Sequence, residues 1–340
     1  MPELTICMAS SLNLQDSRAA IESALAVCEA RDALLLIADT SADEEKKAFW
    51  QDKSPHINYL VSEAPTAIDN IIFAVQSSQT PFIIPMADND LLLIEKDVAP
   101  FDLADLPFDY IGVFPVAEIV LSRDEQGQLS TFSLEQDDAT ERMFAYLQLD
   151  LPDNVGSHAI FRREIWLSTL NVFDRSHPNK GAFADRAISI ALFTSGKMAC
   201  DQSLRYRYNF EQLATSELIA AHRQAMFTDA GLPEKTVRYE KLFQFLDVFV
   251  LVNRVGSPLA IDERQRLGRT AVQMIFGAFI ASVANNPNDY EEGVAALAEM
   301  VLEEQDSFNQ FQLGLLMAER VQPGLKDKYV TFIKAAISGL

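Results

Sequence analysis

The sequence predicts a mixed α/β fold over residues 1–210, followed by an all-helical region over 211–340. Two observations support this division. Up to residue 210, short and almost continuously apolar segments alternate with stretches whose apolar residues recur at helical spacing. Beyond that point the strand signals stop, and helical segments punctuated by prolines follow one another. We therefore expect two domains, 1–210 and 211–340.

The first domain contains four apolar segments that are expected to be strands, and the first two have the pattern of buried strands. They are Leu4–Met8 (LTICM), Ala33–Ala38 (ALLLIA), Ile57–Val61 (INYLV) and Pro81–Met86 (PFIIPM). The amphipathic segments between them are Ser17–Glu29, Ala42–Gln51 and Thr66–Ser77. Apolar strands that alternate with helices are typical of a parallel sheet with helices on both faces. A further strand is expected over Tyr110–Val120, followed by a polar, acidic loop over 122–140.

The second domain is expected to be a helical bundle. Its helices are predicted over Ser216–Ala230, Glu234–Asn253, Asp262–Ala284, Tyr290–Glu304 and Lys326–Ser338. The longest apolar stretch, Ala271–Ala284, is shorter than the roughly 20 residues that are needed to cross a bilayer. We therefore expect no transmembrane span.

The charge balance argues against a nucleic-acid partner. The 340 residues include 28 Lys and Arg but 49 Asp and Glu, which gives a net charge of −21. Such a chain lacks the cationic face that releases counterions from a nucleic acid, so no nucleic-acid partner is expected. Cys7, Cys28 and Cys200 are widely spaced among apolar neighbours, which favours free thiols and a cytoplasmic location. Peripheral association with the inner membrane face and homo-oligomer formation both stay open.

Polar side chains follow three of the predicted strands at the point where each strand ends. Ser10 follows the first strand, Asp39 and Ser41 the second, and Asp88 and Asp90 the fourth. Ligands of open α/β sheets bind beyond the carboxyl ends of the strands, so these side chains mark a candidate site. No glycine-rich dinucleotide or P-loop motif is present. The two carboxylates of Asp88-Asn89-Asp90 could bind Mg²⁺ or Mn²⁺ on a diphosphate, or they could belong to a polar turn that caps the strand.

Five blocks of sequence occur in an order and spacing that match one enzyme family. They are LTICMASSLN (Leu4–Asn13), LLLIADTSAD (Leu34–Asp43), TPFIIPMADNDLL (Thr80–Leu92), GSHAIFRREIW (Gly156–Trp166) and GAFADRAISIALFTSGK (Gly181–Lys197). The sequence over residues 3–210 resembles the family-2-type glycosyltransferases with the GT-A fold, in particular their small bacterial branch, which carries a D-x-D signature. The resemblance implies a GT-A-like nucleotide-diphospho-sugar transferase domain with a mostly parallel sheet. It also implies a hexosyltransferase-type enzyme that moves a sugar from a nucleoside diphosphate donor, usually a UDP-sugar, to a hydroxyl acceptor on a glycan, lipid-linked or small molecule.

The same resemblance implies roles for four aspartates. Asp39 would accept a hydrogen bond from the nucleotide base. Asp88 and Asp90 would hold the ribose and a divalent metal, Mg²⁺ or Mn²⁺, on the diphosphate. Asp185 would be the general base that takes the proton of the acceptor hydroxyl, in a reaction that inverts the anomeric centre.

Four further residues are assigned to binding of the nucleotide sugar. Ser10 and Ser41 lie in the blocks that match the first two strands and their loops. Arg162 and Arg163 could meet the diphosphate, because a guanidinium pairs with phosphate bidentately. A solvated basic turn is the alternative for these two arginines.

Three departures from the family pattern keep other functions open. Asn89 stands between the two aspartates where an acid is common, Ala184 precedes Asp185 where a second acid is frequent, and Asp69 takes the place of a frequent arginine. The Q-x-x-R-W signature of processive synthases is absent, which favours a single-addition enzyme. The alternatives are a non-catalytic binding or assembly protein on this fold and a sugar nucleotidyltransferase. The second usually needs a glycine-rich basic loop after the first strand, and SSLNLQDSR contains no glycine.

Overall fold

The computed structural model describes residues 2–121, 127–149, 151–152 and 154–338, which divide into two units. The first unit comprises Met1–Gln136, Asp150–Leu167 and Gly196–Ser216, and the second comprises Asp137–Leu149, Ser168–Ser195 and Glu217–Leu340. The division differs from the single boundary expected near residue 210. Helices α4 (Ala139–Leu147) and α6 (Asp185–Phe193), with the later part of α5 (Arg163–Ser176), belong with the C-terminal helices.

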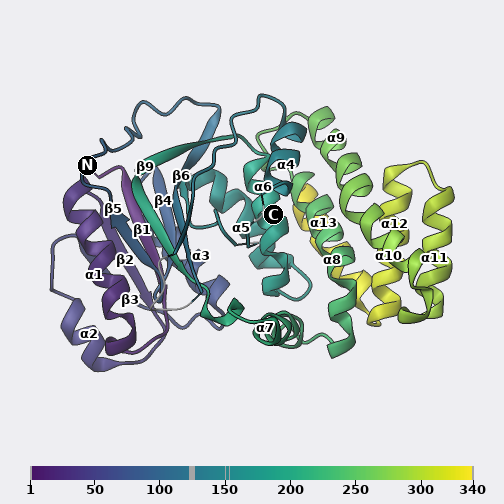
Figure 1. The fold of residues 1–340 in the computed structure, drawn as a ribbon, viewed down its shortest axis with the longest axis horizontal. Helices are drawn as coiled ribbons and strands as arrows, with labels where there is room; N and C mark the ends of the chain where they lie inside the picture. The colour runs from purple at the N-terminus through teal and green to yellow at the C-terminus, as the bar shows by residue number, and fades with distance from the viewer. Residues whose placement is uncertain (1, 122–126, 150, 153, 339–340) are drawn as a thin grey trace. The chain divides into compact units, whose positions relative to one another are not determined.

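A nine-stranded sheet forms the centre of the first unit (Figure 1). In chain order its strands are β1 (Leu4–Ser10), β2 (Leu34–Asp39), β3 (Ile57–Val61), β4 (Phe82–Ala87), β5 (Leu91–Ile94), β6 (Tyr110–Val120), β7 (Gln128–Ser130), β8 (Ile160–Arg162) and β9 (Lys197–Asn209). The order across the sheet is β3-β2-β1-β4-β8-β6-β9-β5, and β7 pairs with β6. Strands β1 to β4 are parallel to one another, as the sequence predicts, whereas β8 is antiparallel to β4. Of the predicted acidic loop, residues 122–126 lie outside the described residues.

Three helices connect the parallel strands: α1 (Leu14–Arg31), α2 (Glu44–Trp50) and α3 (Ala67–Ser77). Each begins after a side-chain cap, because Asn13, Asp43 and Thr66 accept hydrogen bonds from backbone N–H groups of the first helical turn. Apolar side chains of α1 belong to the same core cluster as those on one face of the sheet. Helix α3 packs on β1, β2 and β4 (Figure 1). These caps and apolar faces explain why the predicted helices form where they do.

The register of the parallel strands aligns the polar residues at their carboxyl ends. Ser10 of β1 is paired with Asp39 of β2, and Ala9 of β1 is paired with Ala87 of β4. Asp88 therefore follows β4 at the level of Ser10. The expectation that these three strand ends meet at one edge of the sheet is confirmed.

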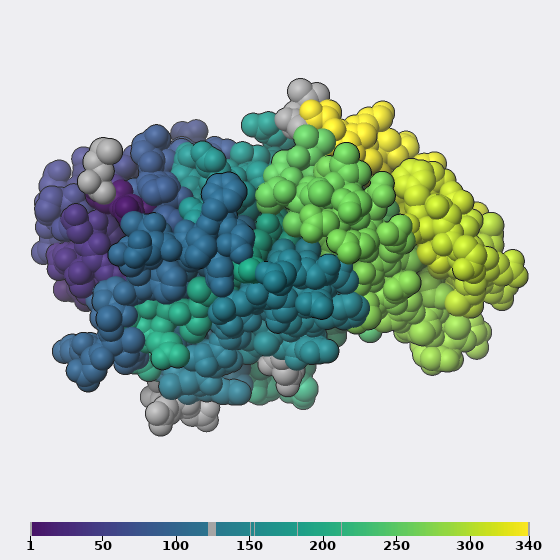
Figure 2. Space-filling view, turned by 90° about the horizontal axis from the view of Figure 1, so that it is seen from above, coloured from purple at the N-terminus to yellow at the C-terminus, as the bar shows by residue number. Residues whose placement is uncertain are grey.

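The second unit consists of helices. Besides α4, α5 and α6, it contains α7 (Ser216–Thr228), α8 (Glu240–Val252), α9 (Ile261–Ala271), α10 (Gly277–Asn285), α11 (Glu292–Glu303), α12 (Ser307–Val321) and α13 (Leu325–Ser338). Helix α8 packs against α6, α9, α12 and α13, and most of its side chains are buried. The later helices form the green and yellow surface in Figure 2.

Among the described α-helices after residue 216, α12 is the one that the sequence analysis omitted. Its middle residue, Gly314, lowers the intrinsic helix propensity of the segment, so propensity alone does not predict a helix there. The structure explains the glycine, because a Cβ atom there would lie 3.3 Å from side-chain atoms of Leu246 and Phe245 of α8. A glycine thus permits close packing of α12 on α8.

One continuous helix in the second unit is long enough to cross a membrane. Helix α9, a π-helical turn over Val272–Phe276 and helix α10 follow without a break, so that Ile261–Asn285 spans 25 residues. Its most apolar window is 56% buried within the protein, as in the core helix of a folded domain. A single helix of this kind is weak evidence for membrane insertion.

Candidate active site

Asp39 ends β2 with a carboxylate that is almost completely buried and fully hydrogen-bonded. Its Oδ1 accepts from Lys46 Nζ at 2.7 Å and from the backbone N–H of Ser41 at 3.3 Å. Its Oδ2 accepts from the hydroxyls of Ser41 at 2.8 Å and Tyr59 at 2.7 Å. A carboxylate has about four lone-pair positions, so the described neighbours occupy all of them. Burial and the hydrogen bond to Asp39 raise the pKa of the Tyr59 hydroxyl, which keeps it a donor.

Asp88 follows β4 and binds the loop after β1. Its Oδ2 accepts hydrogen bonds from the backbone N–H groups of Ser11 at 2.7 Å and Leu12 at 2.8 Å, and from the Ser10 hydroxyl at 2.8 Å. Ser10 in turn accepts a hydrogen bond from Lys46 Nζ at 2.6 Å. The carboxyl ends of β1, β2 and β4 are thus joined in one hydrogen-bond network, which contains Ser10, Asp39, Ser41 and Asp88.

Asp90 lies two residues further on, at the start of β5, and is held by β9. Its Oδ2 accepts from the Tyr206 hydroxyl at 2.9 Å, and its Oδ1 accepts from the backbone N–H of Asn209 at 2.8 Å. Burial raises the pKa of Asp90, and the nearby Asp88 carboxylate adds repulsion in the same direction. The hydrogen bonds from Tyr206 and Asn209 oppose this shift.

His158 is electrostatically coupled to Asp90. Its ring stacks on Tyr206 with centroids 4.9 Å apart, and Nδ1 lies 2.9 Å from the carbonyl oxygen of Pro85. Because a carbonyl can only accept, Nδ1 carries the proton, and burial lowers the pKa of the imidazole so that the neutral form is favoured. In this tautomer Nε2 has a lone pair that could accept a hydrogen bond or bind a metal ion.

Asp88 and Asp90 are the two carboxylates that could contribute ligands to a divalent cation. Within the described ranges, no group of three or more His, Cys, Asp and Glu side chains is arranged to hold a metal. Mg²⁺ is commonly bound through one or two carboxylates, and substrate phosphates and waters complete its octahedron. Asp88 and Asp90 supply two carboxylates, so this donor set suits an ion that arrives with a diphosphate.

Arg162 and Arg163 lie at the opposite edge of the sheet, which corrects the expectation that they meet the diphosphate. Arg162 pairs with Phe82, the first residue of β4, whereas the cluster follows Ala87, about 16 Å further along the strand. The Arg162 guanidinium donates to the carbonyl oxygens of Tyr110, Leu106 and Pro107. That of Arg163 donates to the carbonyls of Val75 and Gln76, so both arginines stabilise loops and helix ends.

Asp185, the predicted general base, is the first residue of α6 and is half-buried. It belongs to the second unit, whereas Ser10, Asp39, Ser41, Asp88 and Asp90 belong to the first. The residue before it, Ala184, provides no side-chain cap for the helix. The role of Asp185 therefore stays a prediction.

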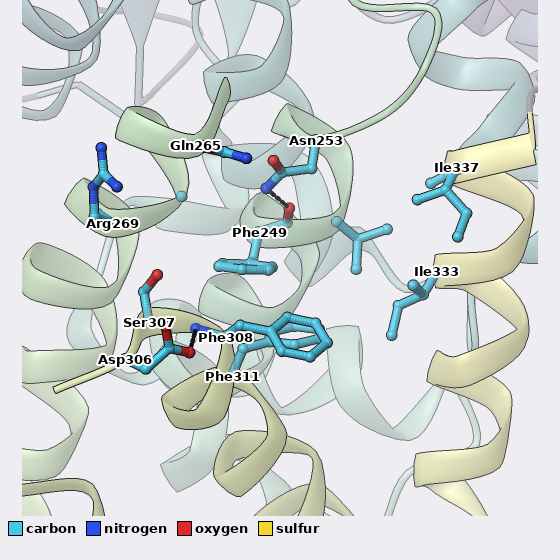
Figure 3. Close-up of a pocket in the computed structure, with 13 residues that line it drawn as sticks. Phe249, Asn253, Gln265, Arg269, Asp306, Ser307, Phe308, Phe311, Ile333 and Ile337 are labelled. Carbon is cyan, nitrogen blue, oxygen red and sulfur yellow. Dashed lines mark hydrogen bonds between the residues drawn. The ribbon is translucent and has the colours of Figure 1, made fainter. Parts of the chain in front are cut away.

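A cavity of about 490 Å³ lies within the second unit, between α8, α9, α12 and α13 (Figure 3). The rings of Phe249 and Phe311 stack in its wall with centroids 4.3 Å apart. Its one acidic side chain, that of Asp306, caps α12 by accepting from the backbone N–H groups of Phe308 and Asn309. The lining suits binding of an apolar group, but it contains no pair of carboxylates for acid–base chemistry.

Three residues of the site escaped the sequence analysis as functional residues: Lys46, Tyr59 and Tyr206. A signal existed for Lys46, because it precedes Trp50 by four residues and so shares its helix face, and Trp50 is buried. Tyr206 and Tyr208 are two residues apart in β9, so they lie on one face of that strand, and both are buried there. Their contacts join segments far apart in the sequence, so no local pattern predicts them.

The comparisons with known proteins bear on the fold. No protein-family model matches the sequence, and no curated protein matches it. Among solved structures, the chain is similar to residues 1–349 of S. aureus TarS, with 10% identity over 100% of this chain and 92% of that chain and a TM-score of 0.50. The same fragment in complex with UDP-GlcNAc aligns with 11% identity, the same coverage and a TM-score of 0.49. The likeness to TarS supports the expected fold class: a GT-A-like α/β domain with a mostly parallel sheet and a C-terminal helical region.

Proposed function

We propose that the protein is a glycosyltransferase that takes a sugar from a nucleoside diphosphate donor, with a UDP-sugar as the expected donor. The observation that carries this proposal is the hydrogen-bonded cluster of Ser10, Asp39, Ser41 and Asp88 at the carboxyl ends of three parallel strands. This edge is where α/β sheets bind nucleotides. The GT-A-like fold supports the same assignment.

Charge at this edge supports a metal-dependent reaction. Three buried aspartates, Asp39, Asp88 and Asp90, gather near it. Among the described residues of the first unit, Lys46 is the one cation hydrogen-bonded to these aspartates, and three acceptors already occupy its ammonium. A diphosphate would meet repulsion here unless a divalent cation accompanied it. Mg²⁺ or Mn²⁺ held by Asp88 and Asp90 would stabilise the negative charge that develops on the leaving nucleoside diphosphate.

The residues of this chain would perform the remaining tasks of the transfer. Asp39 would accept from the nucleotide base, while Ser10 and Ser41 would keep the loops of the site in place. Asp185 would accept the proton of the acceptor hydroxyl as that oxygen bonds to the anomeric carbon, opposite the leaving group. Attack from that side inverts the anomeric centre, and one sugar is added in each reaction.

Nucleotide binding by the whole chain tests the proposal. We expect UDP to bind more tightly in the presence of Mn²⁺ than in EDTA, by about tenfold or more, because the ion relieves repulsion between the diphosphate and the aspartates. Isothermal titration calorimetry measures both affinities, and the thermal-unfolding midpoint should rise with UDP only when Mn²⁺ is present. AMP, which has neither uracil nor a diphosphate, serves as the control ligand.

The alternative of a non-catalytic binding or assembly protein on this fold gains support from one observation. The cavity beside Phe249 and Phe311 gives the helical unit a binding surface of its own, apart from the aspartate cluster. An absent response to UDP at millimolar concentration, with and without Mn²⁺, would favour this function over the transferase.

A further inference from the structure

Lys46 is a lysine inside the candidate site whose ammonium is completely buried. Its side chain has no exposed surface, and Nζ donates to Asp39 Oδ1 at 2.7 Å, Ser10 Oγ at 2.6 Å and the carbonyl oxygen of Leu12 at 2.7 Å. An ammonium has three donors, so all of them are used. Burial of such a charge is costly unless it is paired and hydrogen-bonded, and both conditions are met here.

The acceptors of Lys46 belong to two functional parts of the site, the Asp39 carboxylate and the β1 loop. Asp39 is the carboxylate assigned to the nucleotide base, and Ser10 links the ammonium to Asp88. Leu12 uses its carbonyl for Lys46 and its N–H for Asp88, so the loop is held from both sides. The ammonium therefore connects the base-binding carboxylate with the loop that orients the diphosphate-binding aspartate.

Four hydrogen bonds already occupy the lone-pair positions of the Asp39 carboxylate, and this limits how a nucleotide base can bind to it. The base N–H must displace one of the donors around Asp39, and Ser41, half-buried two residues after β2, is the donor best placed to give way. Lys46 keeps the carboxylate oriented during this exchange, because its two other hydrogen bonds anchor it to the β1 loop.

We propose that Lys46 is a positioning residue for the nucleotide, which fixes the Asp39 carboxylate and the β1 loop in the arrangement that binds the donor. The proposal rests on the proposed function and goes beyond it, because Lys46 would touch neither donor nor acceptor. Lys46 acts through its charge and its three hydrogen bonds, and not through the volume of its side chain.

The test is UDP affinity in Mn²⁺, measured by calorimetry for the full chain and for the variants Lys46→Met, Lys46→Arg and Lys47→Met. We expect Lys46→Met to weaken UDP binding by about 10-fold to 100-fold, because a buried carboxylate loses its charged partner. Lys46→Arg should retain affinity within about tenfold of the unchanged protein. Lys47→Met removes a neighbouring lysine that is partly exposed and should leave affinity unchanged.

The relative UDP affinities of the Lys46→Met and Lys46→Arg variants distinguish a positioning role of Lys46 from a packing role. A packing role would make methionine, which is apolar and similar in size, the better replacement, and the larger arginine the worse one. Circular dichroism establishes that each variant is folded, and Lys46→Gln replaces any variant that is not. Wild-type affinity in a folded Lys46→Met or Lys46→Gln variant, or better binding by methionine than by arginine, would overturn the proposal.

A double-mutant cycle with Asp39→Asn gives a second, independent readout. Because the ammonium acts on Asp39, Lys46→Met should cost much less affinity in the Asp39→Asn background than in the unchanged protein. Additive losses would contradict a coupling between the two residues. The failure of the proposed function is recognised separately, since the unchanged protein would then not bind UDP at all.

Discussion

Replacement of Asp90 by alanine is expected to abolish the gain in UDP affinity that Mn²⁺ produces. Asp90 is the buried carboxylate that Tyr206 and Asn209 orient, and it is one of two that could bind the ion. Without it the cation loses a negatively charged ligand, and UDP should bind about tenfold to 100-fold more weakly in Mn²⁺, which corresponds to roughly 1.4–2.7 kcal/mol. Calorimetric titration of UDP in Mn²⁺ and in EDTA measures the difference directly.

Two further variants make this experiment specific. Asp90→Asn retains an oxygen that can accept from Tyr206 while removing the charge, so it separates loss of the ion from loss of a hydrogen bond. Asp97→Ala removes an exposed aspartate a few residues further along the chain and should leave the Mn²⁺ effect intact. An undiminished Mn²⁺ effect in folded Asp90→Ala protein would exclude Asp90 as a metal ligand.

Replacement of Asp185 by asparagine should lower turnover by about 100-fold or more while UDP affinity stays unchanged. A positioned general base contributes roughly 10²- to 10⁴-fold to the rate, and asparagine cannot accept the proton of the attacking hydroxyl. The residues proposed to bind the nucleotide belong to the first unit, so its affinity should not depend on Asp185. The measurement is UDP release from the UDP-sugar that the unchanged protein hydrolyses fastest in a panel of donors.

A matched control for this variant is Asp229→Asn, which changes an exposed aspartate in the same unit. It should retain full turnover. If Asp185→Asn also turns over at the normal rate, the proton goes to another group, and the assignment carried over from the family resemblance is wrong for this chain.

Local sequence patterns predicted the parallel part of the sheet well, for a physical reason. Strands buried on both faces need continuous apolar side chains, and LTICM, ALLLIA and PFIIPM meet this need without help from distant residues. The helix at Ser307–Val321 was missed because Gly314 interrupts its propensity, and only the packing against α8 explains that glycine. The same limit applies to the division into units, since α4 and α6 join distant helices of the chain.

The candidate site was predicted in part. Ser10, Asp39 and Asp88 come together because parallel strands end at one edge, and strand ends can be read from the sequence. Arg162 ends a strand too, but β8 runs antiparallel to β4, so its end lies at the other edge. Strand direction depends on long-range pairing, which a single segment does not encode. Lys46 was overlooked because a lysine is rarely expected on a buried helix face.

The proposed function depends on the binding of a nucleoside diphosphate and its cation by Asp39, which ends β2, and by Asp88 and Asp90, which follow β4. A crystal structure of the full chain with UDP and Mn²⁺ tests it most directly, because anomalous scattering locates the manganese. We predict the uracil within hydrogen-bond distance of Asp39 and a manganese peak within about 2–2.5 Å of an Asp88 or Asp90 oxygen. Nucleotide or manganese bound away from these aspartates would contradict the account.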